Sequence, residues 1–262
     1  FANTLEYTLE VDIPSIGDPV STQYVENFAK KLKLQSGGKD IEIRDYQIEA
    51  VRHSINEGRS LLLSPTASGK SLIIYNLVRY HQRLGRKQLL IVPTTSLVEQ
   101  MFGDFGDYAT ADDWTAEENC HRIYGGKEKS NEAAITISTW QSIYKFPKQW
   151  FEQFDVVYGD EAHNFKAKSL TSILDKCVNS PYRIGTTGTL DGTKTHKLVL
   201  EGIFGAVKKV ITTKKLMEQK SVADLAITCL LLDYCDEDRQ KVKKMTYQEE
   251  MDWIVSHPKR NN

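Results

Sequence analysis

The sequence predicts an α/β domain in which helices cover both faces of a parallel sheet. From about residue 39 onward, short apolar runs alternate with segments of helical periodicity. Runs such as Leu89-Leu90-Ile91-Val92 are apolar throughout, which is typical of strands that are buried on both faces. Polar motifs follow these runs directly. Ligands of such sheets bind at the carboxyl ends of the strands, so we expect the functional site at that edge.

Residues 1–38 precede the alternating pattern and are expected to form a short N-terminal appendage. Residues Leu5–Ile13 alternate like a strand, and residues Tyr24–Leu34 have the spacing of an amphipathic helix. The sequence Ser36-Gly37-Gly38 is typical of a linker. We therefore expect 1–38 to be a connector and 39–212 to form the main lobe.

Within 39–212, apolar runs predict strands and periodic segments predict helices. Helices are expected at about residues 45–56, 70–84, 96–108 and 168–177, with a shorter one around Trp140. Strands are expected at Ser60–Ser64, Gln88–Val92, Arg122–Tyr124, Ala134–Ser138, Asp155–Gly159 and Tyr182–Thr186. Residues 213–262 are expected to be a connector, with an apolar strand-like stretch at Ala223–Tyr234 and a charged helical tail from Asp236.

Composition limits the class of protein that this chain can be, but it does not identify the binding partner. The chain has 262 residues, and 40% of them are hydrophobic, which is enough for one large domain with appendages. No apolar run approaches the roughly 20 residues of a spanning helix, so we expect a soluble, cytoplasmic protein without a membrane partner. The four cysteines lack metal-binding spacing and are expected to be reduced. A net charge of −1 neither favours nor excludes nucleic acid, because such contacts are local.

The segment SPTASGKS at residues 64–71 has the pattern of a phosphate-binding loop between a strand and a helix. Backbone N–H groups and the helix N-terminus attract phosphate there. Lys70 is expected to reach the β- and γ-phosphates of ATP, and the Ser71 hydroxyl to hold Mg²⁺. Further nucleotide contacts are expected from Pro65, Thr66, Ala67, Ser68 and Gly69. Since Ser64 replaces the first glycine of the general pattern, the alternative is a chance Gly-Lys-Ser at a helix start.

A second buried strand ends in the sequence DEAH at residues 160–163. Asp160 is predicted to join the Mg²⁺ shell, and Glu161 to orient or deprotonate the attacking water. The candidate catalytic residues are therefore Lys70, Asp160, Glu161 and His163. The alternative is that the two acids cap the following helix and that His163 is an ordinary loop histidine. The phosphate loop upstream favours the catalytic interpretation.

The order of these motifs resembles that of superfamily 2 helicases of the DEAH-box-like branch. Arg44–Ala50 is similar to the family's R-x-Y-Q-x-x-A segment, and Pro93–Gln100 to its motif Ia. Gly125-Gly126 resembles motif Ib, Thr136–Gln141 resembles motif Ic and Gly185–Leu190 resembles motif III. The resemblance covers most of the chain. It implies a RecA-like P-loop NTPase lobe that binds ATP and Mg²⁺.

The resemblance also implies roles for individual residues. Arg44 and Gln47 would contact the adenine of ATP. Motif III, represented by Thr187, Gly188 and Thr189, would couple hydrolysis to movement on DNA through His163. Residues implied to contact nucleic-acid phosphates are Thr94, Thr95, Gly125, Gly126, Ser138 and Thr139. From the residues alone, helix capping by the first two threonines and a turn at the glycines is the simpler interpretation.

A narrower resemblance is to the UvsW-type helicases of large tailed phages. It is carried by PTTSL at 93–97, STWQS at 138–142, PKQWFEQF at 147–154, TTKKLMEQ at 212–219 and TYQEE at 246–250. The forms DEAH and TGT differ from the DECH and SGS of this subfamily. The resemblance implies unwinding or remodelling of branched DNA, forked DNA and R-loops, including RNA–DNA hybrids, in phage recombination, replication and repair. We expect a monomer in the host cytoplasm.

Superfamily 2 motors need a second RecA-like lobe with a Q-x-x-G-R-x-x-R segment, and no such segment occurs here. These 262 residues alone are therefore expected to hydrolyse ATP very slowly, since arginine fingers contribute about 10³–10⁵ in rate. Residues 1–38 would then be the tail of a DNA-binding module. Two other interpretations stay open: a duplex DNA translocase that does not separate strands, and a nucleotide-gated DNA-binding module. The intact Asp160 and Glu161 argue against the second.

Overall fold

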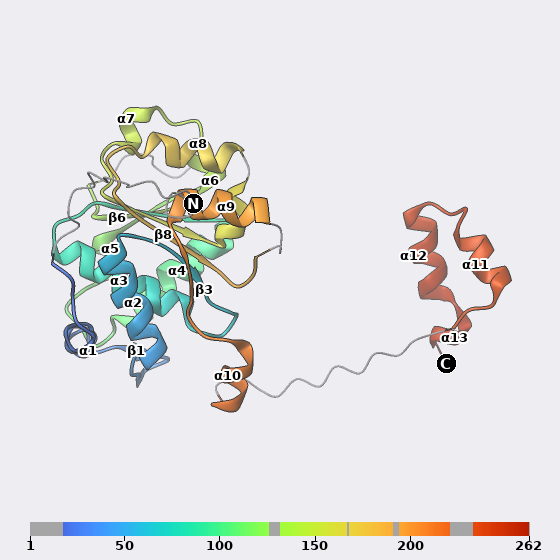
Figure 1. The fold of residues 1–262 in the computed structure, drawn as a ribbon, viewed down its shortest axis with the longest axis horizontal. Helices are drawn as coiled ribbons and strands as arrows, with labels where there is room; N and C mark the ends of the chain where they lie inside the picture. The colour runs from blue at the N-terminus through green and yellow to red at the C-terminus, as the bar shows by residue number, and fades with distance from the viewer. Residues whose placement is uncertain (1–17, 126–131, 167, 191–193, 221–232, 262) are drawn as a thin grey trace, which may run out of the picture. The chain divides into compact units, whose positions relative to one another are not determined.

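The computed structural model describes residues 18–125, 132–166, 168–190, 194–220 and 233–261 (Figure 1). The chain divides into two compact units, Phe1–Val222 and Ala223–Asn262. The described part of the second unit holds the helices α11 (Asp236–Val242), α12 (Tyr247–Ser256) and α13 (Pro258–Asn261). The helical tail expected from Asp236 is therefore confirmed. The strand expected at Ala223–Tyr234 lies almost wholly outside the described residues.

The first unit is built on a seven-stranded parallel sheet, which confirms the predicted α/β fold. The strand order is β5-β6-β4-β7-β8-β3-β9. The strands span Cys120–Ile123 (β5), Ile135–Thr139 (β6), Gln88–Val92 (β4), Val156–Asp160 (β7), Tyr182–Thr187 (β8), Arg59–Leu63 (β3) and Val207–Lys209 (β9). The sequence predicts all of these strands to within a residue or two, except the short edge strand β9, which pairs with β3.

Helices cover both faces of the sheet (Figure 1). One face carries α2 (Asp45–Glu57), α3 (Lys70–Arg83), α4 (Thr95–Tyr108) and α5 (Ala116–Asn119). The other face carries α6 (Trp140–Ile143), α7 (Lys148–Phe151), the 3-10 helix η2 (Ala162–Lys166), α8 (Lys168–Lys176) and α9 (Lys194–Phe204). Neighbouring strand residues point to opposite faces, so Leu62 and Leu90 lie in the first core and Leu61 and Leu89 in the second. Two apolar faces explain the continuous apolar runs.

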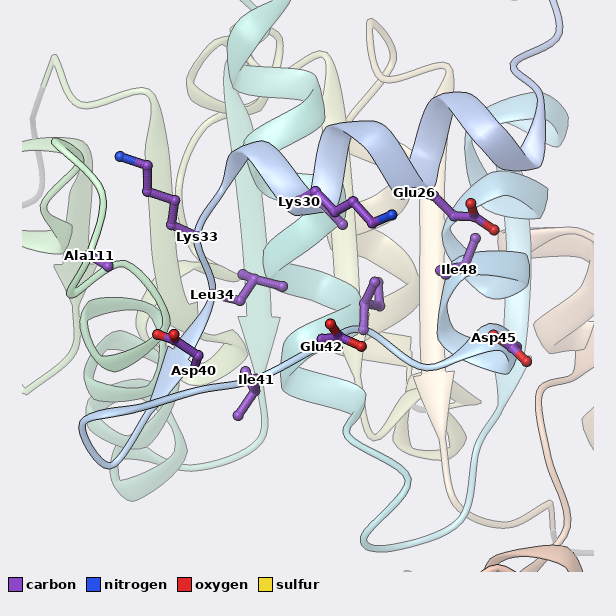
Figure 2. A pocket seen from close by; sticks show the side chains of 12 residues that line it. Glu26, Lys30, Lys33, Leu34, Asp40, Ile41, Glu42, Asp45, Ile48 and Ala111 are labelled. Carbon is purple, nitrogen blue, oxygen red and sulfur yellow. The ribbon is translucent and has the colours of Figure 1, made fainter.

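The segment before the sheet packs onto the first core. Helix α1 (Thr22–Lys31) is capped by the Ser21 hydroxyl and buries Val25 and Phe28 in the core that α2 and α3 share. A pocket of about 540 Å³ lies between α1, the hairpin that follows it and the start of α2 (Figure 2). Apolar and charged side chains both line this pocket, and none of the residues predicted to bind nucleotide is among them. It is therefore separate from the predicted site.

A small hairpin follows α1, formed by β1 (Gln35–Ser36) and β2 (Lys39–Asp40). Gly37 and Gly38 form its turn, and both have the positive φ that favours glycine. The Gly37 N–H donates a 3.0 Å hydrogen bond to the Asp107 carboxylate at the end of α4. The expectation of a linker at these glycines is therefore wrong, because the turn belongs to the compact unit. The strand expected at Leu5–Ile13 lies outside the described residues.

Among the described helices, none combines the length and the hydropathy that a bilayer-spanning segment requires. In the same part of the chain, Cys120, Cys177 and Cys235 are free thiols, while Cys229 is not described. Burial raises the pKa of the Cys120 and Cys177 thiols to about 12. Neither is therefore a ready thiolate near neutral pH.

His81, on the last turn of α3, is a buried histidine whose pKa is strongly lowered. It is fully buried, and its Nδ1 lies 2.8 Å from Nη1 of Arg86. Within the described structure its Nε2 has no hydrogen-bond partner. Burial, with a smaller contribution from the charge of Arg86, lowers the pKa of His81 to about 3. The imidazole is therefore neutral over the whole physiological range.

The buried neutral imidazole predicts acid sensitivity of the fold. The unfolded chain binds a proton at His81 near pH 6.5, whereas the folded chain does so only near pH 3, so acid favours unfolding. The free energy of unfolding should fall by about 2 kcal/mol between about pH 7 and pH 5 through this group. In His81→Gln that part of the fall should disappear, as measured by denaturant titrations at each pH. His121→Gln, on the edge strand, is the control; an unchanged pH dependence in His81→Gln would contradict the assignment.

Candidate nucleotide site and nucleic-acid edge

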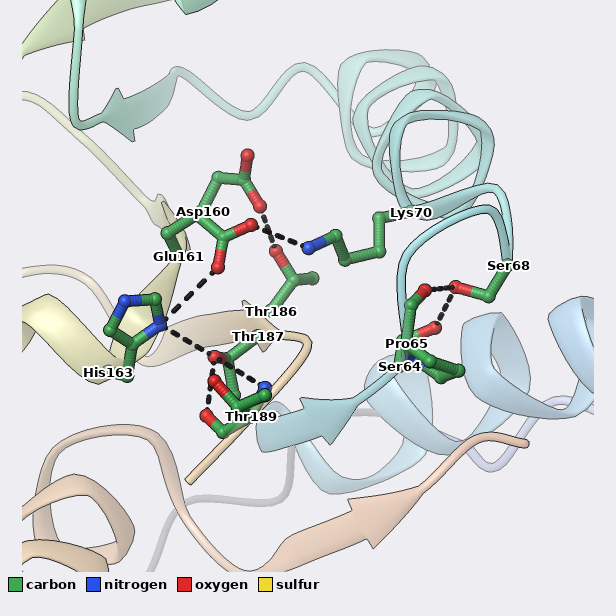
Figure 3. A network of polar contacts seen from close by, with 10 residues as sticks. All are labelled: Ser64, Pro65, Ser68, Lys70, Asp160, Glu161, His163, Thr186, Thr187 and Thr189. Atoms are coloured by element: carbon green, nitrogen blue, oxygen red, sulfur yellow. Dashed lines mark hydrogen bonds and ion pairs between the residues drawn. The ribbon is translucent and has the colours of Figure 1, made fainter. Parts of the chain in front are cut away.

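The strand order brings three predicted motifs to one edge of the sheet. Strand β8 lies between β3 and β7, and all three are parallel. Their register pairs Leu63 with Thr187 and Asp160 with Thr186. The phosphate loop after β3, the acids at the end of β7 and the threonine segment after β8 therefore leave the sheet side by side. Figure 3 shows the polar contacts that join them.

The phosphate loop connects β3 to α3 in a tight turn. The hydroxyls of Ser64 and Ser68 lie 2.6 Å apart, and the Ser68 hydroxyl donates to the Pro65 carbonyl. Ala67 has a φ of +63° and Gly69 a φ of +78°. A left-handed alanine costs about 1–2 kcal/mol relative to glycine, so the fold holds Ala67 in a strained position. Thr66 and Ala67 are exposed at the tip of the turn.

Side chains from the start of α2 brace this loop. The Gln47 Nε2 donates a 2.9 Å bond to the Ser68 carbonyl, and the Tyr46 hydroxyl donates to the same oxygen at 3.1 Å. The Arg44 backbone N–H donates to Gln47 Oε1 at 2.9 Å. A Cβ on Gly69 would lie 2.3 Å from Gln47 Nε2, so the glycine makes room for the amide. Gln47 is only 3% exposed, so contact with adenine would require its amide to be uncovered, although one N–H and one lone pair of the amide are not used by these two bonds.

The predicted catalytic groups meet across the sheet. Nζ of Lys70 lies 2.7 Å from Oε1 of Glu161, although the two residues are 91 positions apart. Asp160 is 7% exposed and accepts a 2.7 Å bond from the Thr186 hydroxyl. Burial raises the pKa of Asp160, while the Thr186 bond and the charge of Lys70 oppose that shift. Glu161 has a φ of +49°, so the turn that ends β7 is strained.

The two residues predicted to hold Mg²⁺ have separate hydrogen-bond partners in the chain. Ser71 Oγ lies 2.8 Å from the Tyr108 hydroxyl at the end of α4, whereas Asp160 is bonded to Thr186. Burial also raises the pKa of Asp104 on α4, and a hydrogen bond with Ser71 opposes this shift. Hydroxyl and carboxylate oxygens are the donors that Mg²⁺ prefers, so the pair fits this ion.

The predicted coupling segment touches both the acids and the loop. Nδ1 of His163 lies 2.9 Å from Thr187 Oγ1 and 3.3 Å from Glu161 Oε2. The Thr187 hydroxyl donates to the Thr189 carbonyl at 2.8 Å, so its oxygen must accept the contact from His163. That assigns a proton to Nδ1. A Cβ on Gly188 would lie 3.7 Å from the Ser64 carbonyl oxygen, which places this glycine beside the phosphate loop.

The predicted nucleic-acid residues lie along the other half of the same edge, where β4, β6 and β5 are neighbours. Thr94 and Thr95 are exposed at the start of α4, and the Thr94 hydroxyl caps the helix by accepting from Leu97 N–H. Gly125 is exposed with a φ of +52°. Gly126 lies outside the described residues. Helix capping and nucleic-acid contact are thus compatible at Thr94, because capping uses only one lone pair of its hydroxyl.

Ser138 and Thr139 differ from the other nucleic-acid candidates because they are buried. The Ser138 hydroxyl donates to the Ile123 carbonyl at 2.8 Å, and Thr139 Oγ1 lies 2.8 Å from Ser142 Oγ. Direct contact with a phosphate would require these side chains to be uncovered. Trp140 follows them and stacks edge-on against Tyr144 as part of the second core.

Comparison with known proteins identifies the family. A family model described as "Type III restriction enzyme, res subunit" matches residues 40–192. The chain is 37% identical over 268 residues to the ATP-dependent DNA helicase uvsW of Enterobacteria phage T4. That alignment covers all of this chain and 52% of the relative. The chain belongs to the superfamily 2 helicases and resembles UvsW.

Solved helicase structures have the same fold as this superfamily 2 chain. A crystal structure of T4 UvsW matches with a TM-score of 0.71 and 34% identity, covering 79% of this chain and 74% of that one. A second UvsW structure covers 99% of this chain and 51% of its own, also with a TM-score of 0.71. Among curated proteins, the DNA 3'-5' translocase XPB2 of Sulfurisphaera tokodaii is 32% identical over 164 residues, or 63% of this chain and 34% of the relative. This chain thus spans about half, or less, of the curated relatives named here.

The sequence analysis assigns no role to three residues that contribute to the site: Tyr46, Thr186 and Tyr108. Tyr46 and Thr186 lie inside the motifs Arg44–Ala50 and Gly185–Leu190, so the sequence does indicate that they are near the site. Tyr108 gives no such signal, because an aromatic residue at a helix end is usually part of the core. Only the packing of α4 against α3 reveals its contact with Ser71.

The brace on the phosphate loop predicts the effect of Gln47→Glu. The substitution replaces the Nε2 donor with a carboxylate oxygen that faces the Ser68 carbonyl. We expect the unfolding free energy to fall by about 1–3 kcal/mol and ATP affinity to fall with it, because the Ser68 carbonyl loses one of its two donors and faces a buried carboxylate oxygen instead. Denaturant titration and fluorescent-nucleotide binding measure the two effects. Gln23→Glu on α1 is the control, and unchanged nucleotide affinity in Gln47→Glu would show that the brace is dispensable.

Proposed function

We propose that this chain is the first motor lobe of an ATP-dependent DNA helicase that unwinds or remodels branched DNA, forked DNA and R-loops. The observation that carries the proposal is the meeting of Lys70, Asp160 and Glu161 at one edge of the sheet, beside exposed candidates for phosphate contact at Thr94 and Thr95. The similarity to T4 UvsW, an ATP-dependent DNA helicase, supports the substrate class. The proposed partner is DNA, including RNA–DNA hybrids, and the proposed working form is a monomer.

The contacts of the site suggest how each residue would act on ATP. The γ-phosphate would replace Glu161 as the partner of Lys70, and the released Glu161 carboxylate would orient the attacking water and accept its proton. Ser71 and Asp160 would hold Mg²⁺, which neutralises charge on the phosphates when it is bound. The backbone of residues 65–69 would cradle the phosphates, and Arg44 and Gln47 would lie on the adenine side.

A second function, translocation on duplex DNA without strand separation, is favoured by one observation. The relative that is 32% identical over 164 residues is named a DNA 3'-5' translocase. The ATP-site chemistry would be the same in both cases. A strand-displacement assay and a protein-displacement assay on the full-length protein separate the two functions, because a translocase displaces bound protein and leaves the duplex intact.

The proposed chemistry predicts that Glu161→Gln stops hydrolysis but not binding. The amide cannot accept a proton from water, so DNA-stimulated ATPase of the full-length protein should fall by about 10²–10⁴-fold. The assay uses single-stranded, duplex, forked and RNA–DNA substrates, and fluorescent-nucleotide titration follows binding. Glu152→Gln, at the C-terminal cap of α7, is the control. ATPase that survives Glu161→Gln would contradict the role of Glu161, and equal turnover on all substrates would contradict the branched-DNA preference.

The contact between His163 and Thr187 predicts a coupling defect. Thr187→Val keeps the shape of the side chain but removes the hydroxyl that joins His163 to the Thr189 carbonyl. We expect unwinding by the full-length protein to be lost while DNA-stimulated ATPase stays within about threefold of wild type, because no group that touches phosphate is removed. Thr187→Ser, which retains the hydroxyl, should behave like wild type. An equal loss of both activities in Thr187→Val would exclude a coupling role.

A further inference from the structure

The hydroxyl of Ser71 is held by a helix that reaches the nucleic-acid half of the site. Ser71 lies in the first turn of α3, and its Oγ is 2.8 Å from the hydroxyl of Tyr108, the last residue of α4. Either hydroxyl can be the donor of this bond, because each has one proton and lone pairs that accept.

The opposite end of α4 lies at the exposed nucleic-acid edge. Thr94 caps the helix and Thr95 is its first residue. One turn further, Glu99 bonds to Arg122 and Tyr124, the residues that lead to Gly125. Helix α4 is about 20 Å long, since each residue adds roughly 1.5 Å. A single helix thus connects three exposed candidates for phosphate contact with the hydroxyl of Ser71.

Aromatic packing ties the far end of α4 to α3. The Tyr75 ring on α3 lies 5.5 Å from the ring of Tyr108, 5.4 Å from Phe105 and 5.8 Å from Trp114. Tyr75 is one turn from Ser71 and is fully buried, as is Phe105. Interiors packed in this way do not deform continuously, so a shift of α4 must alter the contact between Tyr108 and Ser71 or move α3 with it.

We propose that Tyr108 is a positioning residue through which α4 couples nucleic-acid contact at Thr94 and Thr95 to the Mg²⁺-binding hydroxyl of Ser71. This inference rests on the proposed function, because both ends of α4 must meet the ligands assigned to them. The Ser71 hydroxyl has one proton and two lone pairs, so its bond to Tyr108 restricts the direction in which a lone pair can face Mg²⁺. Groups that orient a metal ligand in this way tune the affinity of the metal site.

The test measures the coupling between the two ligands in the full-length protein. A fluorescent, non-hydrolysable ATP analogue is titrated in the presence of Mg²⁺, and its Kd is measured with and without a forked DNA oligonucleotide. Tyr108→Phe keeps the ring but removes the hydroxyl. We expect the DNA-induced shift in nucleotide Kd to shrink by about three- to tenfold, the effect of one hydrogen bond. With EDTA in place of Mg²⁺, the DNA-induced shift should no longer differ between variant and wild type.

Thermodynamic reciprocity supplies a second measurement on the same variant. The nucleotide must shift the DNA Kd by the same factor by which DNA shifts the nucleotide Kd, so both shifts should shrink together. Tyr75→Phe is the matched control, because it removes a hydroxyl from the same ring cluster, where it accepts from Arg79 and not from Ser71. It should retain the wild-type shift.

Several outcomes would overturn the inference. A full DNA-induced shift in Tyr108→Phe, or an equal loss in Tyr75→Phe, would show that Tyr108 only packs, while the proposed helicase function would stand. A Tyr108→Phe defect that persists unchanged in EDTA would also exclude an effect through Ser71 and Mg²⁺. If wild type itself shows neither DNA-stimulated ATPase nor a DNA-induced shift, the proposed function fails, and the inference fails with it.

Discussion

The parallel pairing of β3, β8 and β7 is the constraint on which the site depends. In this register Leu63 lies beside Thr187 and Asp160 beside Thr186, so three loops leave the sheet at one edge. Parallel strands must be joined by crossovers, which separates their loops widely along the chain. Lys70 and Glu161 are nevertheless close enough for an ion pair. The pairing of the strands, and not closeness in the sequence, therefore brings the candidate catalytic side chains together.

Polar groups at this edge are bonded to one another, and the bonds explain how strained turns persist. Lys70 is paired with Glu161, Asp160 with Thr186, and the Ser68 carbonyl accepts from two side chains. Buried polar groups without partners would destabilise the fold, so these contacts stabilise it in the form seen here. Ala67 and Glu161 keep left-handed backbones because the surrounding bonds fix them. In the proposed function, a phosphate oxygen replaces Glu161 as the acceptor for Lys70, so this contact would be exchanged when ATP binds.

Strand order also divides the edge into two neighbouring halves. The loops after β3, β8 and β7 carry the groups that suit ATP, and those after β4, β6 and β5 carry the candidates for nucleic acid. Because β4 pairs with β7, the two halves meet at one strand pair. Helix α4 begins just after β4 and ends at Tyr108, which contacts Ser71 on α3, so it is well placed to respond to both halves. Within the ATP half, the contact between His163 and Thr187 connects the segments that follow β7 and β8.

The sequence by itself determined the α/β class, the strand Gln88–Val92 to the residue, and the motifs that meet at the candidate ATP site, because these depend on local patterns of burial and spacing. Tertiary structure alone decided the strand order, the hairpin turn at Gly37, the bracing role of Gln47 and the burial of Ser138. Each of these depends on contacts between segments distant in sequence, and local periodicity contains no information about such contacts. Tyr108 belongs to the same group: its residue type is unremarkable, and only the packing of α4 on α3 gives it a partner.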